Sequence, residues 1–180
     1  MKLLPPDFQV TKYGLTARFV TEKDAEFITQ LRSDKSLGRY IHASDGDIEK
    51  QIQWIKEYKE RESKGLDFYF IFYIGKEPQG VARIYNIHEY DFTSGSWIFK
   101  HDAKLGIAPI GDIISREIAY SLYPNSINYF DVRKDNISVV RYAMSYKPEI
   151  IREDELNIYF KETKEQFDKY KKIYLRMVKQ

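Results

Sequence analysis

A short loop that runs into an amphipathic helix is the part of the sequence best suited to chemistry. The loop spans residues 103–108 around Gly106, with Lys104 beside it, and isoleucines at helical spacing follow it as far as Tyr123. The first N–H groups of a helix have no partner inside the helix, and the helix dipole makes that end partly positive. Such an end binds phosphate groups readily. Because expected strands at 95–100 and 127–132 flank this unit, the pattern predicts a cofactor that carries a pyrophosphate.

Two further groups of residues are suited to binding an anion. Arg39, Tyr40 and His42 form a basic patch in a connector between two expected helices. This patch suits a phosphate or a carboxylate, although a solvated loop has the same composition. Arg83 lies in the middle of an expected strand, where a charge is costly unless it is paired. It therefore either faces a functional site or meets a carboxylate.

The composition excludes several classes of protein. The 180 residues include no cysteine, which excludes disulfides, thiolate zinc sites and a cysteine nucleophile. With 29 basic and 27 acidic residues, the net charge is only +2, too small to indicate nucleic acid as the main partner. No apolar run is long enough to span a bilayer, and the first six residues are too short to make a signal peptide. We expect a cytoplasmic protein with no membrane partner.

Hydrophobic periodicity predicts the secondary structure. Strands are expected at residues 15–20, 68–74, 80–88, 95–100, 127–132, 150–152 and 156–160. Helices are expected from Thr21, from Asp45 or Asp47 to near Gly65, from the loop to Tyr123, from Asp135 to Tyr146, and at about 163–178. Capping boxes are predicted at Thr21 with Asp24 and at Thr163 with Gln166. Residues 89–94 are expected to form a turn.

The order of these elements predicts the fold class. Strands joined by short turns are antiparallel neighbours, whereas the helical crossover from 95–100 to 127–132 has to be parallel and right-handed. We therefore expect one α+β domain over residues 1–180. Its single mixed, largely antiparallel sheet should have about seven strands flanked by helices.

Three segments resemble the GCN5-related N-acetyltransferase (GNAT) superfamily, and the resemblance covers about Leu15 to Phe160. Residues 15–25 are similar to the first strand and helix of its ribosomal-protein-alanine acetyltransferase branch. Residues 80–87 resemble its third strand, and residues 132–142 resemble its fifth strand and the asparagine-led helix after it. The resemblance implies the GNAT fold, with acetyl-coenzyme A (acetyl-CoA) wedged between two adjacent parallel strands, 95–100 and 127–132, that splay at their C-terminal ends.

Two positions depart from the family pattern. The family's pyrophosphate loop usually begins with Gln or Arg where this chain has Ala103, so Lys104 would supply the positive charge. Many members place a tyrosine acid seven residues beyond the asparagine, where this chain has Ala143. Tyr142 is its neighbour, about 100° around the helix. Tyr142 is therefore the candidate general acid, with a packed aromatic side chain as the alternative.

The remaining roles follow from the chemistry of acetyl transfer. The reaction needs a neutral amine, donors for the developing oxyanion and a proton for the thiolate. The N–H groups of residues 98–100 are expected to serve the oxyanion, unless they belong to an ordinary sheet ladder. Asn136 would either bond the cofactor or cap its helix. The residues expected to contact acetyl-CoA are Ile98, Phe99, Lys100, Lys104, Leu105, Gly106, Ile107, Ala108, Ile110, Gly111, Asn136 and Ser138. Those expected to contact the acceptor are Arg39, Tyr40, His42 and Arg83.

The leading hypothesis is an N-acetyltransferase that moves acetyl from acetyl-CoA to a small primary amine. Among relatives, the chain most resembles enzymes acting on amino sugars of nucleotide-linked surface-polysaccharide precursors. Within the class, the alternative acceptors are a protein N-terminus and an aminoglycoside. Ala103 and Ala143 keep open a catalytically degenerate acyl-CoA-binding domain. A nucleic-acid-binding module is suggested only by the aromatic residues and the slight positive charge, and a homodimer is one option for the oligomeric state.

Overall fold

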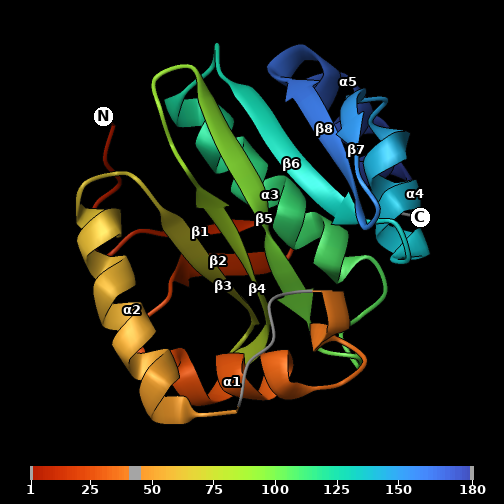
Figure 1. The fold of residues 1–180 in the computed structure, drawn as a ribbon. Coiled ribbons are helices and arrows are strands. Elements are labelled where there is room, and N and C mark those ends of the chain that lie inside the picture. The colour runs from red at the N-terminus through yellow and green to blue at the C-terminus, as the bar shows by residue number, and fades with distance from the viewer. Residues whose placement is uncertain (1, 41–45, 179–180) are drawn as a thin grey trace.

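An eight-stranded mixed sheet forms the centre of the computed structural model, which describes residues 2–40 and 46–178. Figure 1 shows the strands in the order β1-β2-β3-β4-β5-β6-β8-β7. They are β1 (Gln9–Lys12), β2 (Leu15–Phe19), β3 (Phe68–Ile74), β4 (Glu77–Tyr85), β5 (Asp91–Phe99), β6 (Ile127–Arg133), β7 (Glu149–Glu153) and β8 (Asn157–Thr163). The sheet confirms the expected α+β fold. Its extra strand is β1, which pairs antiparallel with β2.

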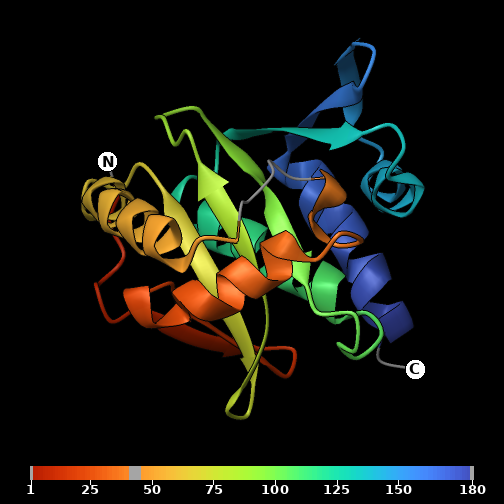
Figure 2. The same ribbon diagram turned by 60° about the horizontal axis from the view of Figure 1, so that its bottom comes forward.

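Helices cover both faces of this sheet (Figure 2). In the described part of the chain they are η1 (Glu22–Asp24), α1 (Ala25–Ser33), η2 (Gly38–Tyr40), α2 (Ile48–Ser63), α3 (Ile107–Leu122), α4 (Ile137–Ser145) and α5 (Lys164–Val178). The α1 and α2 helices share one core cluster with Tyr69 and Ile71, whereas α3 shares another with Phe70 and Phe72. Successive side chains of β3 thus face opposite layers, which explains its unbroken apolar sequence. Within residues 2–40 and 46–178, no helix combines the length and the apolar character that a membrane span requires.

The expected helix caps are present, with one exception. Thr21 and Asp24 form a capping box ahead of α1, and the side chain of Asp47 accepts the Lys50 N–H at the start of α2. The amide oxygen of Gln166 accepts the Thr163 N–H at 2.9 Å, which makes the reciprocal cap of α5. The exception is α4, where the prediction of Asp135 as cap was wrong. The side chain of Asn136 accepts the Val139 N–H instead.

The strand before the anion loop is longer than expected, because β5 begins at Asp91. Residues 91–94 were expected to be a turn, and that prediction was wrong. Phe92 is buried with its ring 5.0 Å from that of Tyr120, so this segment packs in the core although its neighbours are polar. The chain reversal is confined to residues 86–90 between β4 and β5. This extension supplies the only part of β5 that pairs with β6.

Candidate functional site

The strands β5 and β6 are paired at one end and separate at the other. Their parallel pairing runs from Asp91 opposite Ile127 to Thr93 opposite Tyr129. Beyond these residues β5 pairs with β4, and β6 pairs with β8. We call the resulting gap the fork, and Figure 1 shows the two strands diverging there. The prediction of adjacent, parallel strands that splay at their C-terminal ends is confirmed.

The free side of β5 offers backbone donors to the fork. The Lys100 N–H donates to the Gln79 carbonyl on β4 at 2.9 Å. Because N–H groups alternate along a strand, the Phe99 N–H points the other way, toward the fork. Of the three N–H groups expected to serve the oxyanion, only that of Phe99 therefore faces the fork. Those of Ile98 and Lys100 point toward β4. Upstream, a bulge interrupts the pairing opposite Ala82, and Ser96 takes a positive φ of 49°.

The loop after β5 ends in a left-handed residue that starts α3. Gly106 has φ 86° and occupies the N-cap position. The first helical hydrogen bond runs from the Ile110 N–H to the Gly106 carbonyl at 3.2 Å. The Ala108 N–H, in the turn before it, has no carbonyl within the helix to meet. This helix end, with the exposed Lys104 beside it, fits the pyrophosphate of a coenzyme A.

An outer groove of about 760 Å³ connects this loop to the mouth of the fork. That volume is in the usual range for small-molecule sites. Of the residues expected to contact acetyl-CoA, the groove is lined by Ile98, Phe99, Lys100, Lys104, Leu105, Gly106, Ala108, Asn136 and Ser138. Ile107 and Ile110 lie on the buried side of α3 instead, and Gly111 lies against the Phe99 ring. These three support the loop rather than line the groove.

The groove also includes residues that sequence reasoning missed. Ser36 and Leu37 come from the connector after α1, and His101 follows β5. The Ser36 hydroxyl lies 2.5 Å from the His101 imidazole and donates to Asp34 at 2.6 Å. The connector is thereby joined to the loop that carries Gly106. The polar run from 33 to 36 was the only signal in the sequence, and it is indistinguishable from an ordinary solvated loop.

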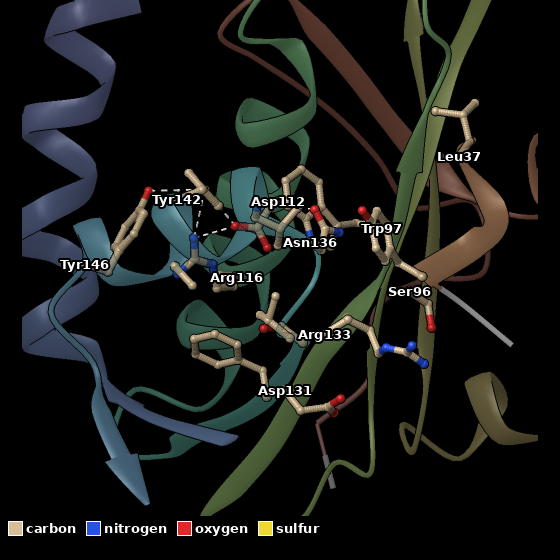
Figure 3. Close-up of a pocket in the computed structure, with 17 residues that line it drawn as sticks. Leu37, Ser96, Trp97, Asp112, Arg116, Asp131, Arg133, Asn136, Tyr142 and Tyr146 are labelled. Atoms are coloured by element: carbon tan, nitrogen blue, oxygen red, sulfur yellow. Dashed lines mark hydrogen bonds and ion pairs between the residues drawn. The ribbon is translucent and has the colours of Figure 1, made fainter. Parts of the chain in front are cut away.

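An inner cavity of about 140 Å³ lies deeper in the fork (Figure 3). It adjoins the outer groove, with which it shares part of its lining: Leu37, Tyr40, Trp97, Asn136, Val139 and Tyr142. Its charged lining comes from Asp131 and Arg133 of β6 and from Asp112 and Arg116 of α3. None of these four was among the expected site residues. Asp112 and Arg116 are four residues apart within a helix that is otherwise apolar on that side. That spacing was the signal that sequence reasoning overlooked.

Tyr142 stands where the outer groove meets the inner cavity. Its hydroxyl donates to the Asp112 carboxylate at 2.8 Å and accepts from the Arg116 guanidinium at 3.0 Å. Its ring packs 5.5 Å from that of Trp97. Burial and the Asp112 charge raise the pKa of Tyr142 well above its ordinary value, against the opposing effect of Arg116. Both readings of Tyr142, as a site residue and as a packed aromatic, are therefore compatible with its position.

Of the residues expected to contact the acceptor, the structure describes the side chains of Tyr40 and Arg83. Tyr40 lines both the groove and the cavity, and its hydroxyl donates to the Asp135 carbonyl at 3.1 Å. Arg39 belongs to η2, and His42 lies outside the described residues. Arg83 donates to the buried Asp67 carboxylate at 2.8 Å. Of the two alternatives for Arg83, the structure thus contains the pairing with a carboxylate.

The Arg83 guanidinium also packs against aromatic rings, 5.0 Å from Trp54 and 4.7 Å from Tyr85. It is held on the side of the sheet that carries α2. This pairing offsets the cost of a half-buried charge in a central strand.

The chain is similar in structure to several known acetyltransferases. It is 33% identical to FdhC, a nucleotide-linked sugar GNAT determined in its apo form, over 94% of this chain and 98% of that one, with a TM-score of 0.82. The ribosomal-protein-S5-alanine acetyltransferase of Vibrio fischeri is 13% identical, with 89% of this chain and 99% of that chain covered and a TM-score of 0.75. The spermidine N-acetyltransferase of Vibrio cholerae, in complex with CoA and spermine, is 12% identical, with 87% and 99% covered and a TM-score of 0.71. No family model and no curated protein sequence matches the chain.

Proposed function

Because the chain belongs to the GCN5-related N-acetyltransferase superfamily, we propose that it moves an acetyl group from acetyl-CoA to the amine of a nucleotide-linked amino sugar. The observation that carries this proposal is the continuity of the Gly106 loop, the outer groove and the fork. A phosphate-binding helix end and a strand with a free N–H lie along one path. A pyrophosphate at the loop and a thioester at β5 would lie at the two ends of the pantetheine arm of a coenzyme A ester.

The donor contributes a thioester whose carbonyl carbon accepts the amine nitrogen. A C–N bond forms, the C–S bond breaks, and the proton lost by the nitrogen balances the one gained by the sulfur. The Phe99 N–H is the donor we assign to the developing oxyanion, because it points into the fork. Lys104 and the first turn of α3 hold the diphosphate charge.

Tyr142 is our candidate to supply the proton of the leaving thiol, directly or through a water. Its position at the junction of groove and cavity supports this role. Its raised pKa argues for a small contribution, because a tyrosinate beside Asp112 is unfavourable. A coenzyme A thiol leaves without much help near neutral pH, since thiols titrate near pH ~8.5. Binding and orientation would then account for most of the rate.

The acceptor that we propose is the amine of a nucleotide-linked sugar. Support comes from FdhC, described as a nucleotide-linked sugar GNAT, which is 33% identical along almost the whole chain. A protein N-terminus and an aminoglycoside are the alternative acceptors. A domain that binds acyl-CoA without catalysis is the second candidate. It is favoured by Ala103 and Ala143, at positions where the family pattern usually has Gln or Arg and a tyrosine.

The test is release of free thiol from acetyl-CoA by the purified protein. Three acceptors at equal concentration separate the alternatives: a nucleotide-linked amino sugar, a peptide with a free N-terminus, and an aminoglycoside. We expect thiol release only with the sugar nucleotide. Thiol release with the peptide or the aminoglycoside would show that this amine, and not the sugar nucleotide, is the acceptor. Tight binding of acetyl-CoA with no release for any amine would support the non-catalytic domain.

A further inference from the structure

A fully buried asparagine meets β5 at the point where the fork opens. Asn128, on β6, has no exposed surface. Its amide oxygen accepts the Ser94 N–H at 3.0 Å, and its amide nitrogen donates to the Ser94 hydroxyl at 2.9 Å. Ser94 is the first residue of β5 beyond the last paired residues, Thr93 and Tyr129. A side chain thus occupies the backbone donor of β5 where the parallel pairing stops.

A buried carboxylate, which is itself paired with an arginine, holds the amide of Asn128 in this orientation. Its nitrogen also donates to the Glu162 carboxylate of β8 at 3.3 Å. Glu162 is itself fully buried and accepts from the Arg116 guanidinium at 2.8 and 3.0 Å. Because Arg116 also donates to Tyr142, one chain of contacts runs from the base of the fork to the groove.

Filling a protein core with these polar groups costs free energy. Burying an amide and an ion pair is costly even when they are hydrogen-bonded, and apolar residues of similar volume often stabilise as well or better. Polar groups in such a position are best accounted for by a geometry that they specify. The geometry specified here is the point at which β5 and β6 stop pairing.

We propose that Asn128 holds the fork open for the acyl donor. By occupying the Ser94 N–H, it prevents the ladder between β5 and β6 from extending into the space that the thioester arm needs. Asn128 is a positioning residue, since it acts through Ser94 and not on the reacting atoms. This inference rests on the proposed function.

The test compares Asn128→Leu, which keeps the branched shape and the number of heavy atoms of the side chain, with the wild type in a calorimetric titration of acetyl-CoA. We expect the dissociation constant to rise at least tenfold. The urea midpoint of unfolding should fall as well, because Ser94 and Glu162 lose a buried hydrogen-bond partner. With a confirmed acceptor, KM for acetyl-CoA should rise while kcat at saturation stays within threefold. Ser94→Ala removes one of the two contacts and should raise the dissociation constant about threefold. If Asn128→Leu does not fold, Asn128→Ala, which also frees the Ser94 N–H, replaces it in the same titration.

The control is Ser126→Ala at the closed end of the same two strands. Ser126 is buried and donates to the Glu89 carbonyl at 3.3 Å, so its loss removes a comparable contact away from the fork. We expect wild-type affinity for this variant. Equal affinity of the Asn128→Leu, Ser94→Ala and wild-type proteins would overturn the inference and leave the proposed function intact. Absence of binding by the wild type would overturn the proposed function, and this inference with it.

Discussion

The hydroxyl of Tyr142 donates a 2.8 Å hydrogen bond to the carboxylate of Asp112. Burial and this neighbouring negative charge raise the pKa of Tyr142 well above its ordinary value. A group of this kind gives up its proton reluctantly, because the tyrosinate formed would face a carboxylate in a buried site. The same bond fixes the ring beside Trp97, where it shapes the junction of the outer groove and the inner cavity.

Removing the Tyr142 hydroxyl should therefore have a small effect on catalysis. A positioned general acid contributes about 100- to 10,000-fold where the leaving group needs it. We expect Tyr142→Phe to lower kcat by less than about tenfold, because the thiol leaves readily and the phenol is a weak donor. Steady-state thiol release with a confirmed acceptor measures this.

The matched control is Tyr159→Phe on β8. It also removes a hydrogen bond from a tyrosine hydroxyl to a carboxylate, here that of Asp154 at 2.7 Å. Its turnover should equal that of the wild type. A thousandfold loss confined to Tyr142→Phe, with unchanged affinity for acetyl-CoA, would make Tyr142 the essential acid.

Gly106→Glu should abolish tight binding of acetyl-CoA. The substitution places a carboxylate near the proposed pyrophosphate site, and two unit charges about 6 Å apart repel by roughly 3 kcal/mol at an effective dielectric constant of about 20. That corresponds to a loss of roughly 100-fold in affinity. Calorimetric titration gives the two dissociation constants.

The backbone strain of this substitution has its own control in Gly14→Glu. Gly14 has φ 82°, close to the 86° of Gly106, but lies between β1 and β2 with open space around it. It should lose a similar amount of stability, about 1–2 kcal/mol, and keep wild-type affinity. If both glutamate variants bind as tightly as the wild type, the loop does not hold a phosphate.

Lys104→Ala should weaken binding modestly and make it less sensitive to salt. Lys104 is exposed at the loop, so its attraction to the pyrophosphate is screened by ions, and we expect a loss of about fivefold. Titrations at two ionic strengths should show a shallower salt dependence than in the wild type. Lys76→Ala, an equally exposed lysine in the turn between β3 and β4, should behave as the wild type does. Identical salt dependence in all three proteins would show that Lys104 does not interact with the bound acetyl-CoA.

The ion pair between Arg18 and Asp24 should make the free energy of unfolding depend on pH in the acid range. Burial by itself would raise the pKa of Asp24, but bonds from Arg18 and Thr21 lower it below its ordinary value of 3.8. A carboxyl whose pKa is lowered by folding stabilises the protein above its unfolded pKa and loses that contribution as the pH falls through the folded value. Urea unfolding should show Asp24→Asn to be less stable by about 2 kcal/mol at pH 7. That difference should shrink below pH 3.8, and a difference that is independent of pH would contradict this account.

Local signals in the sequence predicted most of the fold. Short-range chemistry determined the caps at Thr21, Asp47 and Thr163, and the crossover rule predicted the parallel pair of β5 and β6. The start of β5 was misplaced because its alternating polar residues resemble a turn, whereas Phe92 is held there by distant partners. The cap of α4 was misplaced by one residue because Asp135 and Asn136 are both good caps.

The candidate site was predicted less completely. The loop at Gly106 has a local signature, so the sequence marked it as a candidate phosphate site, and the structure shows that it lines the outer groove. The cluster of Arg116, Glu162 and Asn128 was missed, because its members are far apart in the sequence and meet only through the fold. Arg83 itself was noticed in the sequence, but its partner was not. Asp67 lies one strand away, and nothing local marks the pair.

The measurement that tests the central claim most directly is a crystal structure of the protein with acetyl-CoA bound. We expect the pyrophosphate within hydrogen-bonding distance of the N–H groups around Gly106. The thioester should lie in the fork with its oxygen facing the Phe99 N–H. Density for the coenzyme at any other surface, or an empty fork at saturating concentration, would contradict the account.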